Sequence, residues 1–211
     1  MTDRFDRVSA ERGFIDRLSR LERGQLAELR RSLGDDRPGD SAQFLEGVIV
    51  RSGMVKGNRQ AQYLIASLYA LIERPHNDES EDETAARVTR EGKSLGHLLG
   101  TQHVEQNKRS GRKPDDSSSI EKRFLALLDA DADALPHQLR QAVALLKGSE
   151  VKPDWARLLA DVSGWNRDDW GDRIRRSWAE DFYRAAAYEG RDDARDNAPD
   201  AQTDPTVEDT E

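Results

Sequence analysis

The chain has 211 residues, of which 36% are hydrophobic and 35% are charged, and its formal net charge is −8. No apolar run is long enough to span a membrane, the charged N-terminus shows no secretory signal, and the absence of cysteine excludes disulfides and thiolate chemistry. These totals favour a charge-coated cytoplasmic protein with one large or two small domains.

The negative charge is concentrated near the C-terminus. Residues 191–211 contain eight acids and two arginines, a contribution of −6, which leaves −2 for the other 190 residues. A second acidic cluster falls in residues 76–83, which we expect to form an exposed loop. Because local charge decides where an anion binds, the rest of the chain has enough cations for basic patches.

Apolar residues recur at helical spacing through the first half of the chain. They predict helices over residues 9–22, 25–33, 41–52, 60–73 and 84–99. The fourth helix is apolar around most of its circumference, so we expect it to run through a core. Arg59 lies at its start, where a cation opposes the helix dipole, and a ligand contact is one reason for such a placement.

Residues 117–148 predict two amphipathic helices folded into a hairpin. Ser118 and Glu121 have the spacing of a capping box, which satisfies free backbone N–H groups at a helix start. Apolar stripes follow in both helices. Arg123 and Arg140 flank these stripes, so we expect the hairpin to carry a basic rim.

Two more helices are expected after the hairpin. Pro153 and Asp154 open the first, which spans 153–163, and Asn166 can cap the second. Apolar residues recur every four positions in the second helix and predict its buried face. They are Trp170, Ile174, Trp178 and Phe182, and Trp155 and Trp165 are expected to join them.

The fold class that follows is all-α, with two small helical bundles joined by a linker and a disordered acidic C-terminal tail. The linker is predicted from the polar stretch 101–116, which contains the basic run NKRSGRKP, and the alternative is a mobile basic loop within the fold. The expected boundaries are 1–104 for the N-terminal bundle, 105–117 for the basic polar linker, 118–189 for the C-terminal bundle and 190–211 for the tail.

Catalytic and metal-binding motifs are not found. The histidines form no HExxH or other metal-ligating pattern, and we expect surface or rim positions for His76, His97, His103 and His137. The acids of residues 129–133 lack the glycine and distal glutamate of a calcium loop. We therefore expect no enzyme, no metal and no cofactor, and a metal- or histidine-dependent hydrolase has little support.

Basic residues are the better lead, because fixed cations along a surface can bind phosphates and arginine can bind two oxygens at once. For any single pair the alternative is a solvated face or an ion pair on a helix surface. Arg173, Arg175 and Arg176 follow several aspartates, so local pairing is expected to explain them. Tyr63 and Tyr69 fall at helical spacing and are expected in the core.

Several stretches, in their order and spacing, carry a family resemblance over most of residues 5–188. They are RGQLAELRRSLG, NRQAQYLIASLYAL, KSLGHLLG, EKRFLALLDAD, QLRQAVALL, KPDWARLLADVSGW and WAEDFYRAA. Together they resemble the CasB family, the small subunit of the type I-E CRISPR surveillance complex Cascade. The resemblance implies an all-α, non-catalytic subunit present in two copies against the backbone and large subunits. It also implies a basic path beside the guide RNA and the target, which helps to hold the displaced DNA strand.

By this resemblance, certain positions match the basic surface of the family. They are Arg31, Arg59, Arg123 and Arg140, with Arg30, Lys56 and Lys122 as neighbours and Lys93 as a weaker match. Where relatives can carry consecutive cations after Trp165, only Arg167 keeps the charge here. The competing hypothesis is a pure scaffold, in which these cations contact partner proteins and never touch nucleic acid.

Overall fold

The computed structural model describes residues 8–31, 43–73, 93–113, 116–147 and 152–196, with side chains up to residue 187 in the last range. These ranges form nine α-helices and, apart from an isolated bridge between Lys93 and Pro153, no β-structure. This confirms the all-α prediction. The helices are α1 (Ser9–Ser19), α2 (Arg23–Arg31), α3 (Gln43–Arg51), α4 (Arg59–Ile72), α6 (Leu95–Arg109), α7 (Ser119–Leu128), α8 (Leu135–Ala144), α9 (Trp155–Gly164) and α10 (Asp168–Asp196).

Side-chain caps fix helix starts that the sequence predicted. Ser118 Oγ accepts the backbone N–H groups of Ile120 and Glu121, both at 3.1 Å, and so begins α7. Asp154, expected in a first turn, is the N-cap of α9 and accepts the N–H of Arg157 at 3.0 Å. Each cap contributes about 1 kcal/mol by satisfying donors that the helix itself leaves free.

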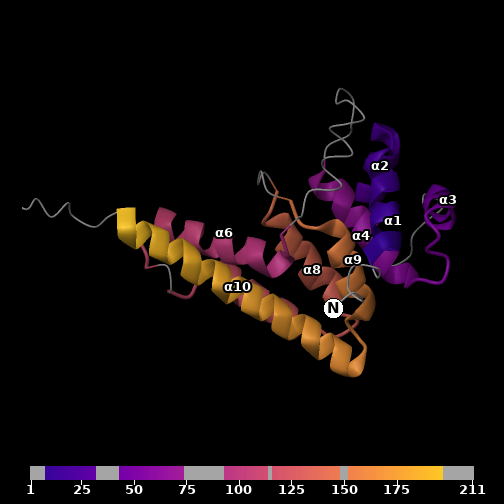
Figure 1. Cartoon of the computed structure of the whole chain (residues 1–211). Coiled ribbons are helices and arrows are strands. Elements are labelled where there is room, and N and C mark those ends of the chain that lie inside the picture. The colour runs from indigo at the N-terminus through magenta and orange to yellow at the C-terminus, as the bar shows by residue number, and fades with distance from the viewer. Residues whose placement is uncertain (1–7, 32–42, 74–92, 114–115, 148–151, 197–211) are drawn as a thin grey trace, which may run out of the picture.

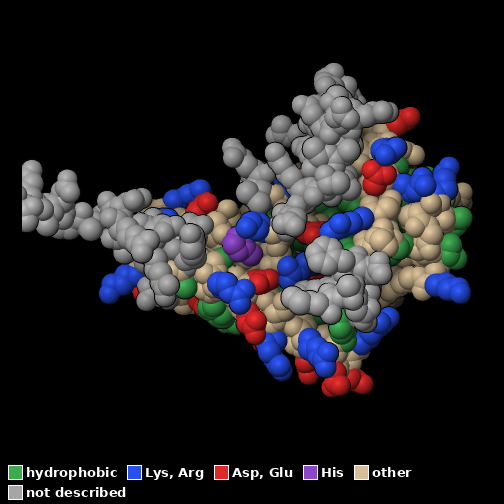
Figure 2. All heavy atoms as spheres, in the orientation of Figure 1, with side chains coloured by type: hydrophobic (Ala, Val, Ile, Leu, Met, Phe, Trp, Pro, Cys, Tyr) green, Lys and Arg blue, Asp and Glu red, His purple; other side chains and the backbone are tan. Residues whose placement is uncertain are grey.

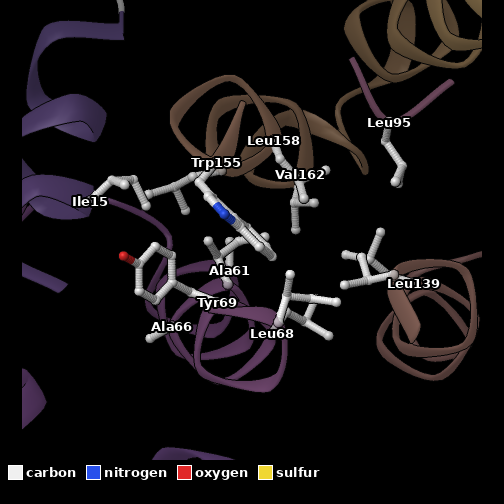
Figure 3. Packing of buried hydrophobic residues seen from close by; sticks show 14 of the residues in the cluster. Ile15, Ala61, Ala66, Leu68, Tyr69, Leu95, Leu139, Trp155, Leu158 and Val162 are labelled. Atoms are coloured by element: carbon white, nitrogen blue, oxygen red, sulfur yellow. The ribbon is translucent and has the colours of Figure 1, made fainter. Parts of the chain in front are cut away.

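The core is centred on α4, as predicted, because most residues of this helix are buried. Trp155 of α9 points toward α4 (Figure 3), and its ring and that of Tyr69 meet edge-on, with centroids 5.5 Å apart. Its Nε1 donates to Glu73 Oε1 at 3.0 Å, so the one polar atom of the buried indole is satisfied. Truncating such a side chain to alanine removes about 3–5 kcal/mol of stability.

Helices α6 and α10 lie side by side and extend away from the group formed by α1 to α4 (Figure 1). Their backbones approach closely at Gly96 and Gly100. A Cβ atom would lie 2.2 Å from the carbonyl oxygen of Trp178 at the first position and 2.3 Å from that of Phe182 at the second. Only glycine therefore permits this contact, which we call the α6–α10 seam.

A polar network ties the start of α6 to α9 and α10. Ser94, the N-cap of α6, donates to Asp181 Oδ2 at 2.6 Å, and Arg157 Nη2 donates to the same oxygen at 3.2 Å. Nearby, Trp178 Nε1 donates to Asp161 Oδ2 at 2.8 Å. The charge of Asp181 is thus balanced within the fold, and this network is structural.

The linker prediction is wrong over residues 101–109, because α6 continues through Arg109. The polar residues that suggested a linker have partners inside the fold. His103 Nδ1 lies 2.7 Å from Ser118 Oγ, and Asn107 Nδ2 donates to the carbonyl of Asp116 at 2.6 Å. The predicted boundary at residue 104 thus falls inside a helix that packs against α10, and the division into two bundles stays a prediction.

Two further expectations need correction. Trp170 is 40% exposed and does not share the buried face of Ile174, Trp178 and Phe182, because its ring lies over Gly164 at the edge of the core. Helix α10 reaches Asp196, so the first part of the predicted disordered tail is helical. Residues 74–92, with the acidic loop and most of the helix predicted over 84–99, and the tail from 197 onward lie outside the described residues.

Candidate nucleic-acid interface

The eight cations expected to contact nucleic acid differ in how exposed their side chains are and in whether other residues of the chain bind them. Five are exposed, and no hydrogen bond or ion pair within the described residues holds their side chains. They are Arg31, Lys56, Lys93, Lys122 and Arg123. We call these the five exposed cations. The other three, Arg30, Arg59 and Arg140, are partly buried.

Arg30 lies near the end of α2 and ties this helix to the end of α4. Its Nε donates to the carbonyl oxygen of Ala70, and its Nη2 donates to that of Glu73 at 3.2 Å. The last carbonyls of a helix have no partner within the helix, so the guanidinium satisfies acceptors that would otherwise be free. Arg30 therefore has a structural role, whereas its neighbour Arg31 stays exposed.

Arg59, the first residue of α4, is held by an acid from α3. Its Nη2 lies 3.1 Å from Glu46 Oε2, and its Nη1 donates to Gln62 Oε1 at 3.1 Å. The hydroxyl of Tyr63 donates to the other carboxylate oxygen, Glu46 Oε1, at 2.8 Å. We call these four side chains the Arg59 cluster.

The Arg59 cluster has a defined protonation state. Burial, followed by the hydrogen bond and the negative charge of Glu46, raises the pKa of Tyr63 to about 12. Tyr63 therefore keeps its proton at neutral pH and remains a donor to the carboxylate. The charge of Arg59 is matched by one carboxylate, so the cluster as a whole is neutral.

Arg123 and Arg140 come from the two helices of the predicted hairpin, α7 and α8. Both are the same number of residues from the middle of the connecting segment 129–134, so they lie at a similar level along the hairpin. Arg123 is exposed, and Arg140 is partly buried. The Nε of Arg140 is buried, and no hydrogen-bond partner for it lies within the described part of the chain.

The predicted residues do not converge on one pocket. Arg59 begins α4, whereas Arg30 contacts its last turn, and at about 1.5 Å per residue these points are separated by roughly 20 Å. Lys93 lies near the second point, the end of α4. Its carbonyl accepts the N–H of Asp154, and the following residue, Trp155, donates to Glu73 at the end of α4. Cations spaced over such a distance suit a polymer with repeated charges better than a single small anion.

Figure 2 shows one face of the molecule, on which lysine and arginine side chains are spread over several elements with acidic side chains among them. Arginines can also have structural roles, and local pairing with an aspartate, as predicted, is found for Arg175. It pairs with Asp172 at 3.6 Å, donates from Nε to the carbonyl of Leu128 at 3.0 Å, and lies 4.6 Å from the ring centroid of Trp165. Arginine content alone therefore does not define the binding surface.

The histidine prediction is wrong for His103, which is buried between Ser118 and the ring of Phe182. Ser118 Oγ already accepts two backbone N–H groups, so its own hydrogen points to His103 Nδ1 and the histidine completes the α7 cap. Over the described ranges, no group of three or more histidines and acids could hold a metal ion. None of the described helices is both long and apolar enough to cross a membrane.

Sequence reasoning missed Glu46, the acid that neutralises Arg59. The two residues lie on different helices, so no spacing along one helix connects them. Gln62, three residues after Arg59, did have a local signal, because positions i and i+3 are neighbours on a helix.

The sequence profile of the family described as CRISPR-associated protein Cse2 matches residues 25–183. The chain is 34% identical over 185 residues to the CRISPR-associated protein Cse2 of Thermus thermophilus, and the alignment covers 83% of this chain and 91% of the relative. It is similar to the crystal structure of M. ruber CasB, with 30% identity, a TM-score of 0.64 and coverage of 87% and 97%. A chain of a CRISPR RNA-guided surveillance complex shares the fold at 21% identity, with a TM-score of 0.63 and coverage of 89% and 99%.

Proposed function

The chain belongs to the Cse2 family of CRISPR-associated proteins, and on that premise we propose that it is a non-catalytic small subunit of a type I-E Cascade complex. In this role it binds nucleic acid through its basic surface without reading sequence and stabilises the R-loop formed by guide RNA and target DNA. The proposed partners are the backbone and large subunits, a second copy of the chain, the guide RNA, and the target and displaced DNA strands. The proposed location is the cytoplasm.

The five exposed cations carry the proposal. They come from several elements, and no group within the described residues neutralises them, so their charge is available to a partner. Most of the net charge lies in residues 191–211, so the overall value of −8 does not oppose a local basic surface. Backbone phosphates are the partner that cations can bind without base recognition.

The proposed mechanism is electrostatic. R-loop formation exchanges a DNA duplex for an RNA–DNA duplex of similar stability, so protein contacts to the backbone tip the balance. A displaced strand tends to pair again with its complement. Cations along its path lower the free energy of the opened state and release bound counterions. A single arginine therefore contributes little, and several together decide whether the open state persists.

A pure scaffold remains the second candidate, because two predicted contacts are engaged within the chain. Arg30 binds carbonyl oxygens of α4, and Arg59 binds Glu46. If the other cations were likewise matched by acids of partner subunits, nucleic acid would not be contacted. Salt dependence and crosslinking to nucleic acid separate the two candidates.

The test is fluorescence anisotropy of labelled single-stranded DNA and RNA across a salt series. The variant combines Arg31→Ala, Arg59→Ala and Arg123→Ala. Its matched control combines Arg20→Ala, Arg109→Ala and Arg184→Ala, three exposed arginines that pair with acids of their own helices. Both triple variants remove three positive charges, so they differ only in where on the molecule those charges are removed.

We expect the first triple variant to lose most of its affinity at low salt and its salt slope to fall by about 2, since each single-stranded phosphate contact adds about 0.7. The affinity and the salt slope of the control variant should change less. Equal losses in both variants would contradict a located surface. Absence of salt-dependent binding by the wild-type chain, both alone and in the assembled complex, would favour the scaffold.

A further inference from the structure

The Arg59 cluster places an acid where a phosphate is proposed to bind. We propose that Glu46 is an intramolecular competitor of nucleic acid phosphate at Arg59, which lowers the affinity of the free chain for short or stray strands. This inference rests on the proposed function and deepens it. It assigns Glu46 a role in selecting the ligand, namely a polyanionic strand long enough to engage several cations at once.

The pair is accessible to a competing anion. The side chains of Arg59 and Glu46 are 36% and 44% exposed, and their nearest charged atoms lie 3.1 Å apart. An ion pair of this exposure is weak, typically contributing about 0.2–1 kcal/mol, so a phosphate can displace it. A buried pair would instead lock the arginine away from any ligand.

Each member of the pair has a second anchor, so the exchange leaves both side chains in place. Arg59 keeps the hydrogen bond to Gln62, whose own amide Nε2 donates to the carbonyl of Met54 at 2.9 Å. Glu46 keeps the hydrogen bond from Tyr63. A phosphate can therefore take over Arg59 Nη2 without rearrangement of α3 or α4.

The released carboxylate stays near the incoming phosphate and repels it. Binding at Arg59 must therefore be supported by contacts elsewhere, and the five exposed cations can supply them. A short strand reaches only one or two of these cations and gains too little to displace Glu46. An extended strand engages several at the same time, because binding at one cation raises the effective concentration of phosphate at the next.

The experiment compares the full-length wild-type chain with Glu46→Gln, Arg59→Ala and the double variant. The readout is anisotropy of a labelled 30-nucleotide and a labelled 6-nucleotide thymidine strand. Glutamine keeps an oxygen for Tyr63 and removes the charge, and Glu46→Ala is a second variant without the amide. The matched control is Asp16→Asn, which breaks the exposed pair with Arg20 at 3.1 Å, outside the predicted surface. Thermal melting confirms that each variant is folded.

We expect Glu46→Gln to bind both strands about two- to fivefold more tightly at low salt. The gain should vanish when Arg59 is alanine, and Asp16→Asn should leave the affinity within about 1.5-fold of wild type. These results together support the competitor role.

Unchanged or weaker binding by Glu46→Gln, with weaker binding by Arg59→Ala, would overturn the inference and make Glu46 a positioning residue, while the proposed function stands. A gain that persists in the double variant would also overturn it, because the effect would be one of net charge. If no variant shows binding that depends on salt or on Arg59, the proposed function fails first and the inference fails with it.

Discussion

The α6–α10 seam and the five exposed cations use polar and charged groups in opposite ways. At the seam glycine lets two backbones touch, and beside it Ser94 and Arg157 both donate to Asp181. Among the five exposed cations, no partner within the described residues satisfies the charge. The seam can therefore only stabilise the fold, whereas the exposed surface contributes little to stability and is free to bind.

This contrast predicts two separable classes of variant. Changes at the seam should lower the free energy of unfolding and leave the nucleic acid affinity of the folded fraction unaltered. Changes among the five exposed cations should lower the nucleic acid affinity and leave the free energy of unfolding almost unaltered. A seam variant that alters affinity, or a surface variant that unfolds the chain, would break the comparison.

The largest effect is expected for Gly96→Ala in the seam. The new Cβ would lie 2.2 Å from the carbonyl oxygen of Trp178, so α6 and α10 must separate. We expect a loss of about 3 kcal/mol in the free energy of unfolding, measured by denaturant titration. The control is Gly24→Ala in α2, where a Cβ would meet no atom within 4 Å, and it should be neutral or slightly stabilising. Equal effects at both glycines would contradict the seam.

A somewhat smaller loss is expected for Ser118→Ala at the junction of α6 and α7. The change removes two capping hydrogen bonds and leaves His103 without its buried partner. We expect a loss of about 2 kcal/mol in the free energy of unfolding. Ser119→Ala is the neighbouring control, since Ser119 is exposed and its hydroxyl donates to Gln106 at 3.1 Å on the surface, and its effect should stay under about 0.5 kcal/mol.

Adjacent residues of α2 offer the sharpest form of the comparison. Arg30→Ala removes the hydrogen bonds to the α4 carbonyls and should cost about 1.5 kcal/mol of stability. Arg31→Ala should change stability by less than about 0.5 kcal/mol and should lower the salt slope of single-strand binding by about 0.7. Thermal melting and anisotropy on the same samples test both statements, and an exchange of the two phenotypes would refute the assignment.

The smallest effect is expected at alkaline pH in the Arg59 cluster. The pKa of Tyr63 is raised from 10 to about 12, so the neutral tyrosine stabilises the folded state fully below pH 10. This stability is lost as the pH rises through the interval from 10 to about 12. Tyr63→Phe has no such proton to lose, and its stability should fall less than that of the wild type over the same interval. Parallel pH profiles would show that the hydrogen bond to Glu46 contributes nothing.

Local rules were sufficient for most helices, and the family followed from the resemblance of several sequence stretches in their order. The caps at Ser118 and Asp154 and the apolar pattern of α4 depend on residues within one or two turns. The same rules failed for residues 101–109, where polar side chains indicated a linker. Helical periodicity does not reveal that His103 and Asn107 find partners across a helix junction.

The sequence by itself determined the all-α class and the starts of α7 and α9, because these depend on spacing along the chain, and the family resemblance implied a basic surface as the candidate site. Only the tertiary structure decided which cations remain available. Arg30 meets carbonyls of α4 and Arg59 meets Glu46 of α3 because the fold brings residues of separate helices together, whereas Arg31 and Arg123 are exposed. The packing of helices also depends on how closely their backbones can approach, which between α6 and α10 is set by the absence of a side chain at Gly96 and Gly100.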